Sequence, residues 1–260
     1  MSINRKECNP YFQLDGSLNW KCPTCRKSIL KIKAETFHFE QTLHSRNYQL
    51  HNDSLPNDIR YVYSCLLECT NPSCKEIVSN TGIGCVDHDM VDDIDGNPEN
   101  VLVDFFTAKY FSPNLKLFNY PKKIPDNVKD ELEKSFALFF CDYSSSGNHM
   151  RTALENLLTY LKIKKSTTSN GKRKYLALHN RIELLPRKYQ EIQDLLFAIK
   201  WLGNAGSHSG KQVTSDDILD AYELMEELLA EVFTQKRENM KNLAKKINRN
   251  KGPIKSKKWW

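Results

Sequence analysis

The pattern of hydrophobic and polar residues changes character near residue 120. Before that point, short runs rich in aromatic and β-branched residues alternate with turn-forming residues, a pattern typical of β-strands. After it, hydrophobic residues recur every three or four positions, which is the spacing of amphipathic helices. The sequence therefore predicts an α+β protein, in which a small β-rich N-terminal domain precedes an all-α helical bundle.

The β-rich part contains several candidate strands, separated by polar segments. They lie at residues 29–32, 36–39, 59–67, 76–78 and 101–106. The polar stretch 47–57 ends in Leu-Pro-Asn and is expected to be a loop.

A proline-rich segment separates the two parts. Pro121 and Pro125 disfavour helix in the residues that precede them, and Asp126 is a suitable helix cap. Helices are expected at residues 128–140, 150–161, 175–185, 189–202 and 214–233, with a loop at 164–174. The predicted domains are a β-rich zinc-binding domain (1–120), a helical bundle (121–235) and a basic tail (236–260).

Charge is distributed unevenly along the chain. The net charge is +6, yet residues 235–260 alone hold ten lysines and arginines and one acid. Such a tail favours phosphate-rich or acidic partners, although a solvated chain end has the same composition. The candidate nucleic-acid-binding residues are Lys245, Lys246, Arg249, Lys255, Lys257, Lys258, Trp259 and Trp260. The two tryptophans could stack on bases or dock onto a partner protein.

The eight cysteines indicate a metal site. Seven of them precede residue 86, and close cysteine pairs in an intracellular chain are typical of metal ligands. The predicted ligands are Cys22, Cys25, Cys69 and Cys74, in which Cys-Pro-Thr-Cys and an Asn-Pro turn supply the tight bends. Cys65 is the rival ligand, and a set of reduced, buried thiols is the alternative. Both pairs lie where β-structure meets a turn, as in zinc ribbons, so the N-terminal domain is expected to be zinc-ribbon-like. Four thiolates leave no open position, so the zinc would be structural.

The order of motifs in the second half resembles the HEPN superfamily of helical, RNA-associated domains. These motifs are the proline hinge, Arg151-x-x-Leu-Glu-x-x-Leu158, Leu202-Gly-Asn-x-x-x-His208 and Thr214-x-Asp-Asp217. More narrowly, the chain resembles the branch found beside type I restriction subunits and in bacterial defence loci. The resemblance implies a helical bundle that forms a homodimer, with a possible partner protein from a defence system.

Ribonuclease members of that superfamily carry an arginine and a histidine in the cleft of the dimer. Carried over by position, His208 corresponds to the histidine and Asn204 to the polar residue after the arginine. Gly203 occupies the arginine position, which removes the cation that cleavage needs. Lys200, one helical turn earlier, or Arg151 would have to replace it.

Three functions agree with these features. The first is a binding module for nucleic acid, RNA or DNA, in anti-phage defence or restriction, without catalysis of its own. The others are a metal-independent endoribonuclease that uses His208, and a scaffold for a partner nuclease or ATPase. The sequence shows no apolar run of membrane-spanning length and no secretory signal, so a cytoplasmic protein is expected.

Overall fold

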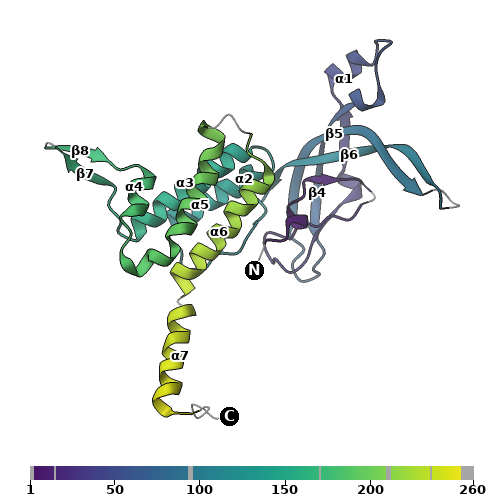
Figure 1. Cartoon of the computed structure of the whole chain (residues 1–260). Coiled ribbons are helices and arrows are strands. Elements are labelled where there is room, and N and C mark those ends of the chain that lie inside the picture. The colour runs from purple at the N-terminus through teal and green to yellow at the C-terminus, as the bar shows by residue number, and fades with distance from the viewer. Residues whose placement is uncertain are drawn as a thin grey trace.

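The computed structural model describes residues 3–14, 16–92, 96–169, 171–208, 212–234 and 236–252, and gives the backbone alone at residues 169, 204–208 and 236–242. An antiparallel sheet forms the N-terminal half, and helices form most of the C-terminal half (Figure 1).

The N-terminal sheet has six strands. They are β1 (Tyr11–Phe12), β2 (Leu30–Ile32), β3 (His38–Gln41), β4 (Arg60–Cys69), β5 (Ile77–Asp92) and β6 (Pro98–Ser112). Their order is β1-β6-β5-β4-β2, and β3 also pairs with β4. The long β5 and β6 strands continue as a two-stranded arm beyond the rest of the sheet (Figure 1).

Two glycines on β5 allow this sheet to curl. A Cβ atom on Gly82 would lie 2.1 Å from the carbonyl oxygen of Thr107, and one on Gly84 would lie 2.8 Å from the ring of Phe106. The register with β6 also shifts between Thr81 and Gly82, and such bulges increase local twist. The backbones of β5 and β6 therefore approach closely, and the sheet bends into a half-barrel.

An aromatic cluster fills the inside of the half-barrel. The Phe106 ring is its centre, with centroid distances of 5.0 to 6.4 Å to the rings of Phe12, Phe37, Phe39, Tyr61 and Tyr63. Phe12 from β1 also contacts Phe37, which directly precedes β3, at 6.4 Å. Because β1 and β3 lie at opposite edges of the sheet, this contact draws the two edges together.

The helices are mostly in the second half of the chain. They are α1 (Leu43–Tyr48), α2 (Asp126–Phe139), α3 (Tyr143–Tyr160), α4 (Leu178–Glu183), α5 (Gln193–His208), α6 (Ser215–Thr234) and α7 (Lys236–Asn250). A hairpin of β7 (Ser166–Ser169) and β8 (Lys172–Tyr175) lies between α3 and α4, and short 3₁₀ helices occur at Arg5–Cys8, Ala34–Thr36, Pro56–Asp58 and Arg187–Ile192.

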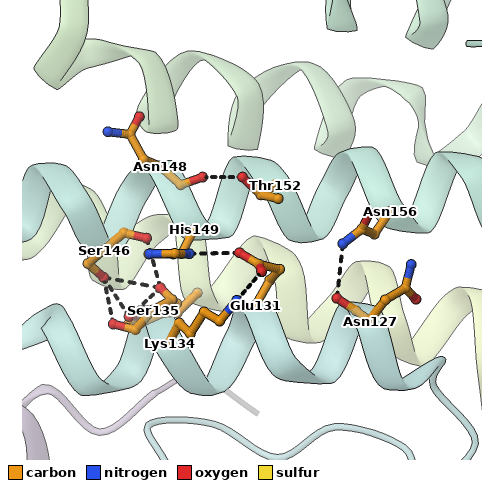
Figure 2. A network of polar contacts seen from close by, with 10 residues as sticks. Asn127, Glu131, Lys134, Ser135, Ser146, Asn148, His149, Thr152 and Asn156 are labelled. Carbon is orange, nitrogen blue, oxygen red and sulfur yellow. Dashed lines mark hydrogen bonds and ion pairs between the residues drawn. The ribbon is translucent and has the colours of Figure 1, made fainter.

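A buried polar network joins three of these helices. The hydroxyl of Tyr222 on α6 lies 2.9 Å from Oγ of Ser135 on α2 and 2.8 Å from Oγ of Ser146 on α3. All three side chains are fully buried, and Ser135 and Ser146 face each other across the α2–α3 contact (Figure 2). Buried hydroxyls need such partners, so the network fixes how α2, α3 and α6 pack.

The two halves share one continuous core. Phe111 at the end of β6 contacts Phe140 at the end of α2, with ring centroids 4.8 Å apart. Arg5, at the start of the chain, forms ion pairs with Asp216 and Asp220 on α6. The N-terminal segment therefore packs against the helical half as well as preceding the sheet.

The predicted fold class was wrong in two respects, although sheet and helices both occur. The N-terminal part is a six-stranded half-barrel rather than a small zinc-ribbon-like domain. The C-terminal part is not all-α and shows the expected bundle only in part, because residues 166–175 form the β7–β8 hairpin. Its strands are polar and charged, so their composition resembles that of a loop, but Gly171 has the positive φ (72°) that a tight turn requires.

The predicted end of the fourth helix at Gly203 was also wrong, since α5 continues to His208. A Cβ atom on Gly203 would lie 3.0 Å from the carbonyl oxygen of Gly147 on α3. The glycine therefore permits a close helix crossing rather than ending the helix.

Tyr222→Phe should destabilise the protein by about 1–2 kcal/mol, because the substitution removes a buried hydroxyl that has two partners. Urea unfolding followed by circular dichroism measures this change. Tyr175→Phe is the matched control, since Tyr175 is 71% exposed and should change stability by less than about 0.5 kcal/mol. Equal stability of the Tyr222→Phe variant and the native protein would show that the network does not hold the helices.

Candidate metal centre

The structure brings together the four cysteines that the sequence singles out. The Sγ atoms of Cys22, Cys25, Cys69 and Cys74 all lie within 4.8 Å of one another. The Cys22–Cys74 distance is 3.8 Å and the Cys25–Cys69 distance is 3.6 Å. The four residues could therefore hold one metal ion.

The first cysteine pair lies in a tight turn. The N–H of Arg26 donates to the carbonyl of Cys22 at 3.1 Å, and the N–H of Cys22 donates to the carbonyl of Ser28 at 2.9 Å. Arg26 has a positive φ of 55°, which turns the chain sharply after Cys25. This local geometry directs both sulfurs to the same side.

The second pair has the same design. Cys69 is the last residue of β4, and the N–H of Asn71 points at its sulfur at 3.4 Å. The N–H groups of Cys74 and Lys75 donate to the carbonyl of Asn71 at 2.9 and 3.1 Å. Lys75 has a positive φ of 54°. Each cysteine pair is therefore followed by a basic residue whose backbone is in the left-handed region.

Strand pairing holds the two turns against each other. Leu30 of β2 lies opposite Cys69 of β4, which brings the chain just after the first turn beside the start of the second. The N–H of Leu30 also donates to the carbonyl of Trp20 at 2.8 Å. The strand pairing therefore brings the two cysteine turns together.

The environments of the thiols differ. The backbone N–H groups of Lys27 and, to a smaller extent, Ser28 stabilise the Cys25 thiolate. Burial acts in the opposite direction, but the pKa of Cys25 is still lowered to about 6. Burial raises the pKa of Cys69 to about 12. Four thiolates this close would repel one another, so only a bound cation would keep them all deprotonated. Four sulfur donors are soft ligands, which suit zinc or iron.

Cys65 is not part of this cluster. It lies on β4 opposite Asn80, is buried, and burial raises the pKa of its thiol to about 12. Since side chains alternate along a strand, Cys65 and Cys69 share the inner face. Only Cys69, at the end of the strand, reaches the turn residues.

The residues suggested for catalysis are described only in part. Lys200 on α5 is 6% exposed, and its Nζ lies 3.3 Å from the centre of the Trp201 ring. Asn204 and His208 lie on α5, but only their backbone is described and not their side chains. The structure therefore places Lys200 without showing whether these three side chains meet.

The suggested nucleic-acid contacts fall into two groups. Lys245, Lys246 and Arg249 are exposed on α7, which extends away from the other elements (Figure 1). The remaining five lie outside the described residues: Lys255, Lys257, Lys258, Trp259 and Trp260.

A charged cluster between α2 and α3 has no counterpart among the sequence predictions. Glu131 accepts from Nζ of Lys134 at 2.6 Å and pairs with Nδ1 of His149 at 2.7 Å (Figure 2). Burial acts to raise the pKa of Glu131, but these two partners hold it below its usual value. The i,i+3 spacing of Glu131 and Lys134 is readable from sequence, whereas the contact with His149 depends on helix packing.

An apolar groove of about 510 Å³ lies beside β2 and β3. Leu14, Ile29, Phe37 and Phe39 are among its lining residues, and Lys31 is the only charged one among those described. Apolar walls of this kind do not suit a strongly charged ligand. Anionic ligands are therefore better sought in the helical half.

Two family models match the chain. Residues 10–111 match the family described as "Domain of unknown function (DUF8608)". Residues 133–250 match the family described as "Domain of unknown function (DUF4145)". No curated protein and no solved structure matches the chain. None of the helices in the described part of the chain is long and apolar enough to cross a membrane.

Cys69→Ser should lower metal affinity at least about tenfold, because it removes one of four ligand atoms. The metal content of the purified protein after dialysis against a weak chelator, measured by plasma mass spectrometry, reports this loss. Cys65→Ser is the matched control, since Cys65 lies on the same strand and face but outside the cluster, and it should keep the metal. The reverse result would make Cys65 the ligand.

Proposed function

We propose that the protein is a zinc-stabilised module that binds nucleic acid, through helix α7, and has no catalysis of its own. The observation that carries this proposal is the position of α7. This basic helix extends away from the rest of the molecule (Figure 1), and Lys245, Lys246 and Arg249 are exposed on it.

The charge of α7 supports a polyanionic partner. The helix holds six basic residues and one acidic residue. The chain as a whole has a net charge of only +6, with ten basic residues and one acid after residue 234. The rest of the protein is therefore net negative overall, whereas α7 is locally basic and can attract phosphates.

The arrangement of side chains on α7 supports the same conclusion. At 100° per residue, Lys245, Lys246 and Arg249 fall within an arc of about 100°. Leu243 and Ile247, 42% and 40% exposed, lie on the opposite side. Three cations on one side of a helix can follow a phosphate backbone.

The sulfur geometry supports zinc as the bound metal. Sulfurs that lie about 2.3 Å from a tetrahedral zinc ion are separated by about 3.8 Å. The 3.8 and 3.6 Å distances of the Cys22–Cys74 and Cys25–Cys69 pairs are close to this value. Four protein ligands complete the coordination, so zinc would stabilise the fold here and leave no position for a substrate.

The triple variant Lys245→Glu, Lys246→Glu, Arg249→Glu should bind labelled 20-nucleotide RNA and DNA at least about tenfold more weakly than the native protein. Removing three phosphate contacts should also reduce the slope of log K against log salt by about 2 for single strands. Fluorescence anisotropy at several salt concentrations measures both quantities.

The matched control is Lys172→Glu, Arg173→Glu, Lys174→Glu on β8, which changes the same kinds of exposed residue. It should bind nearly as well as the native protein. If neither nucleic acid binds, or if both triple variants lose affinity equally, α7 is not the binding site. RNA that is cut in EDTA by the native protein but not by His208→Ala would replace the proposal with a ribonuclease.

A further inference from the structure

Three cations and one carboxylate lie along the seam where α3, α4 and α5 meet. The cations are Arg151 on α3, Arg181 on α4 and Lys200 on α5, and the carboxylate is Glu155 on α3. Glu155 pairs with Arg151, with 3.5 Å between Oε1 and Nε. A second carboxylate, Glu183 on α4, pairs with His179, whose ring lies 6.3 Å from that of Trp201. The three cations outnumber these two carboxylates.

A close helix crossing brings Arg151 and Lys200 together. A Cβ atom on Gly203 of α5 would lie 3.0 Å from the carbonyl of Gly147 and 3.3 Å from Cβ of Arg151. Lys200 precedes Gly203 by nearly one turn and therefore lies on the same side of α5. The side chain of Arg151 starts at this crossing, within electrostatic reach of Lys200.

Lys200 is a buried cation that forms no ion pair with an acidic side chain in the described part of the chain. It is only 6% exposed, and its Nζ lies over the Trp201 ring, 3.3 Å from the centre. Burial lowers the pKa of Lys200, and the charge of Arg151 lowers it further. Among the described side chains, none with a negative charge forms an ion pair with it. A buried charge without a counter-ion is costly, so this position favours a bound anion.

Arg181 extends the positive seam by one helical turn. It is 5% exposed, and its terminal nitrogens donate to the carbonyl of Glu155 at 3.2 Å and to Oγ1 of Thr159 at 3.0 Å. Its Nε is buried and has no hydrogen-bond partner. Two cations that are more than nine-tenths buried thus lie along α3, beside the partly exposed Arg151.

We propose that this seam binds a phosphate group, which Lys200 and Arg151 contact directly. Lysine supplies a point charge and arginine a forked donor for phosphate oxygens. Trp201 is 59% exposed beside Lys200, so a nucleobase could stack next to the bound phosphate. The phosphate would be free or part of a polynucleotide. If the phosphate is part of a polynucleotide, the seam is a second contact with the nucleic acid that α7 is proposed to bind. Phosphate binding by the seam does not itself depend on α7.

The test measures thermal unfolding at constant ionic strength with increasing inorganic phosphate, with chloride as the balancing anion. Phosphate should raise the Tm of the native protein in a saturable way. Lys200→Met should weaken the apparent phosphate affinity at least about tenfold, because one charge-assisted contact is lost, whereas Lys200→Arg should keep the response. Lys188→Met is the matched control, since Lys188 also stacks on the next aromatic residue, at 4.5 Å, but lies outside the seam.

A second arm uses a five-nucleotide RNA without terminal phosphates. If this RNA raises the Tm more than inorganic phosphate does, and the effect requires Lys200, the ligand is a polynucleotide. If inorganic phosphate has the larger effect, the ligand is free phosphate. The α7 triple variant should keep the seam response, so failure of either site can be recognised separately. If Lys200→Met does not fold, Arg151→Gln replaces it. No saturable stabilisation of the native protein by either ligand, or equal stabilisation of the Lys200 variant, would overturn the proposal.

Discussion

The close approach of four cysteine sulfurs is the constraint on which the N-terminal half depends. The sulfurs lie within 4.8 Å of one another, where they are stable together only as ligands of a metal or as neutral thiols. The first cysteine turn also connects to the linker before the helices, because Arg26 donates to the carbonyl of Lys116. A metal bound by these cysteines would fix one end of the half-barrel and the chain segment that leads to α2.

Glycines allow close backbone contacts in both halves of the molecule. Gly82 and Gly84 let β5 and β6 curl around the aromatic cluster, and Gly147 and Gly203 let α3 and α5 cross closely. The first contact produces an apolar interior within the half-barrel. The second contact brings Arg151 and Lys200 together in the helical half. This half also has buried hydrogen bonds, such as those of Tyr222. The molecule thus combines a sheet that carries a candidate metal centre with a helical half that carries the cations of α7 and of the α3–α5 crossing.

The sequence predicts those features whose cause is local. The cysteine turns depend on a few neighbouring residues, so spacing alone identified the cluster, and the Thr214 cap follows local rules. The predicted cap at Asp126 was wrong, because Pro125 precedes the helix without a side-chain cap and Asp126 is its first residue. Features set by distant contacts were not predictable. The polar hairpin at residues 166–175 resembles a loop in composition, and Gly203 resembles a helix end until Gly147 is placed against it. The burial of Lys200 also depends on this crossing and not on its neighbours in sequence.

The strands show the same difference between features with local causes and features set by distant contacts. Local composition located β2 and β4 closely, but it found only the first residues of β5 and the middle of β6. The two strands continue into an arm that carries Asp87, Asp89 and Asp92, residues that disfavour strand formation by propensity. Their pairing with β6 overrides this preference.

The most direct test of this account is X-ray absorption spectroscopy at the zinc edge on protein purified without added metal, combined with metal analysis. The account predicts one zinc ion per chain with four sulfur neighbours at about 2.3 Å. A site with fewer than four sulfurs, or a metal-free protein in which the cysteines form disulfides, would contradict it.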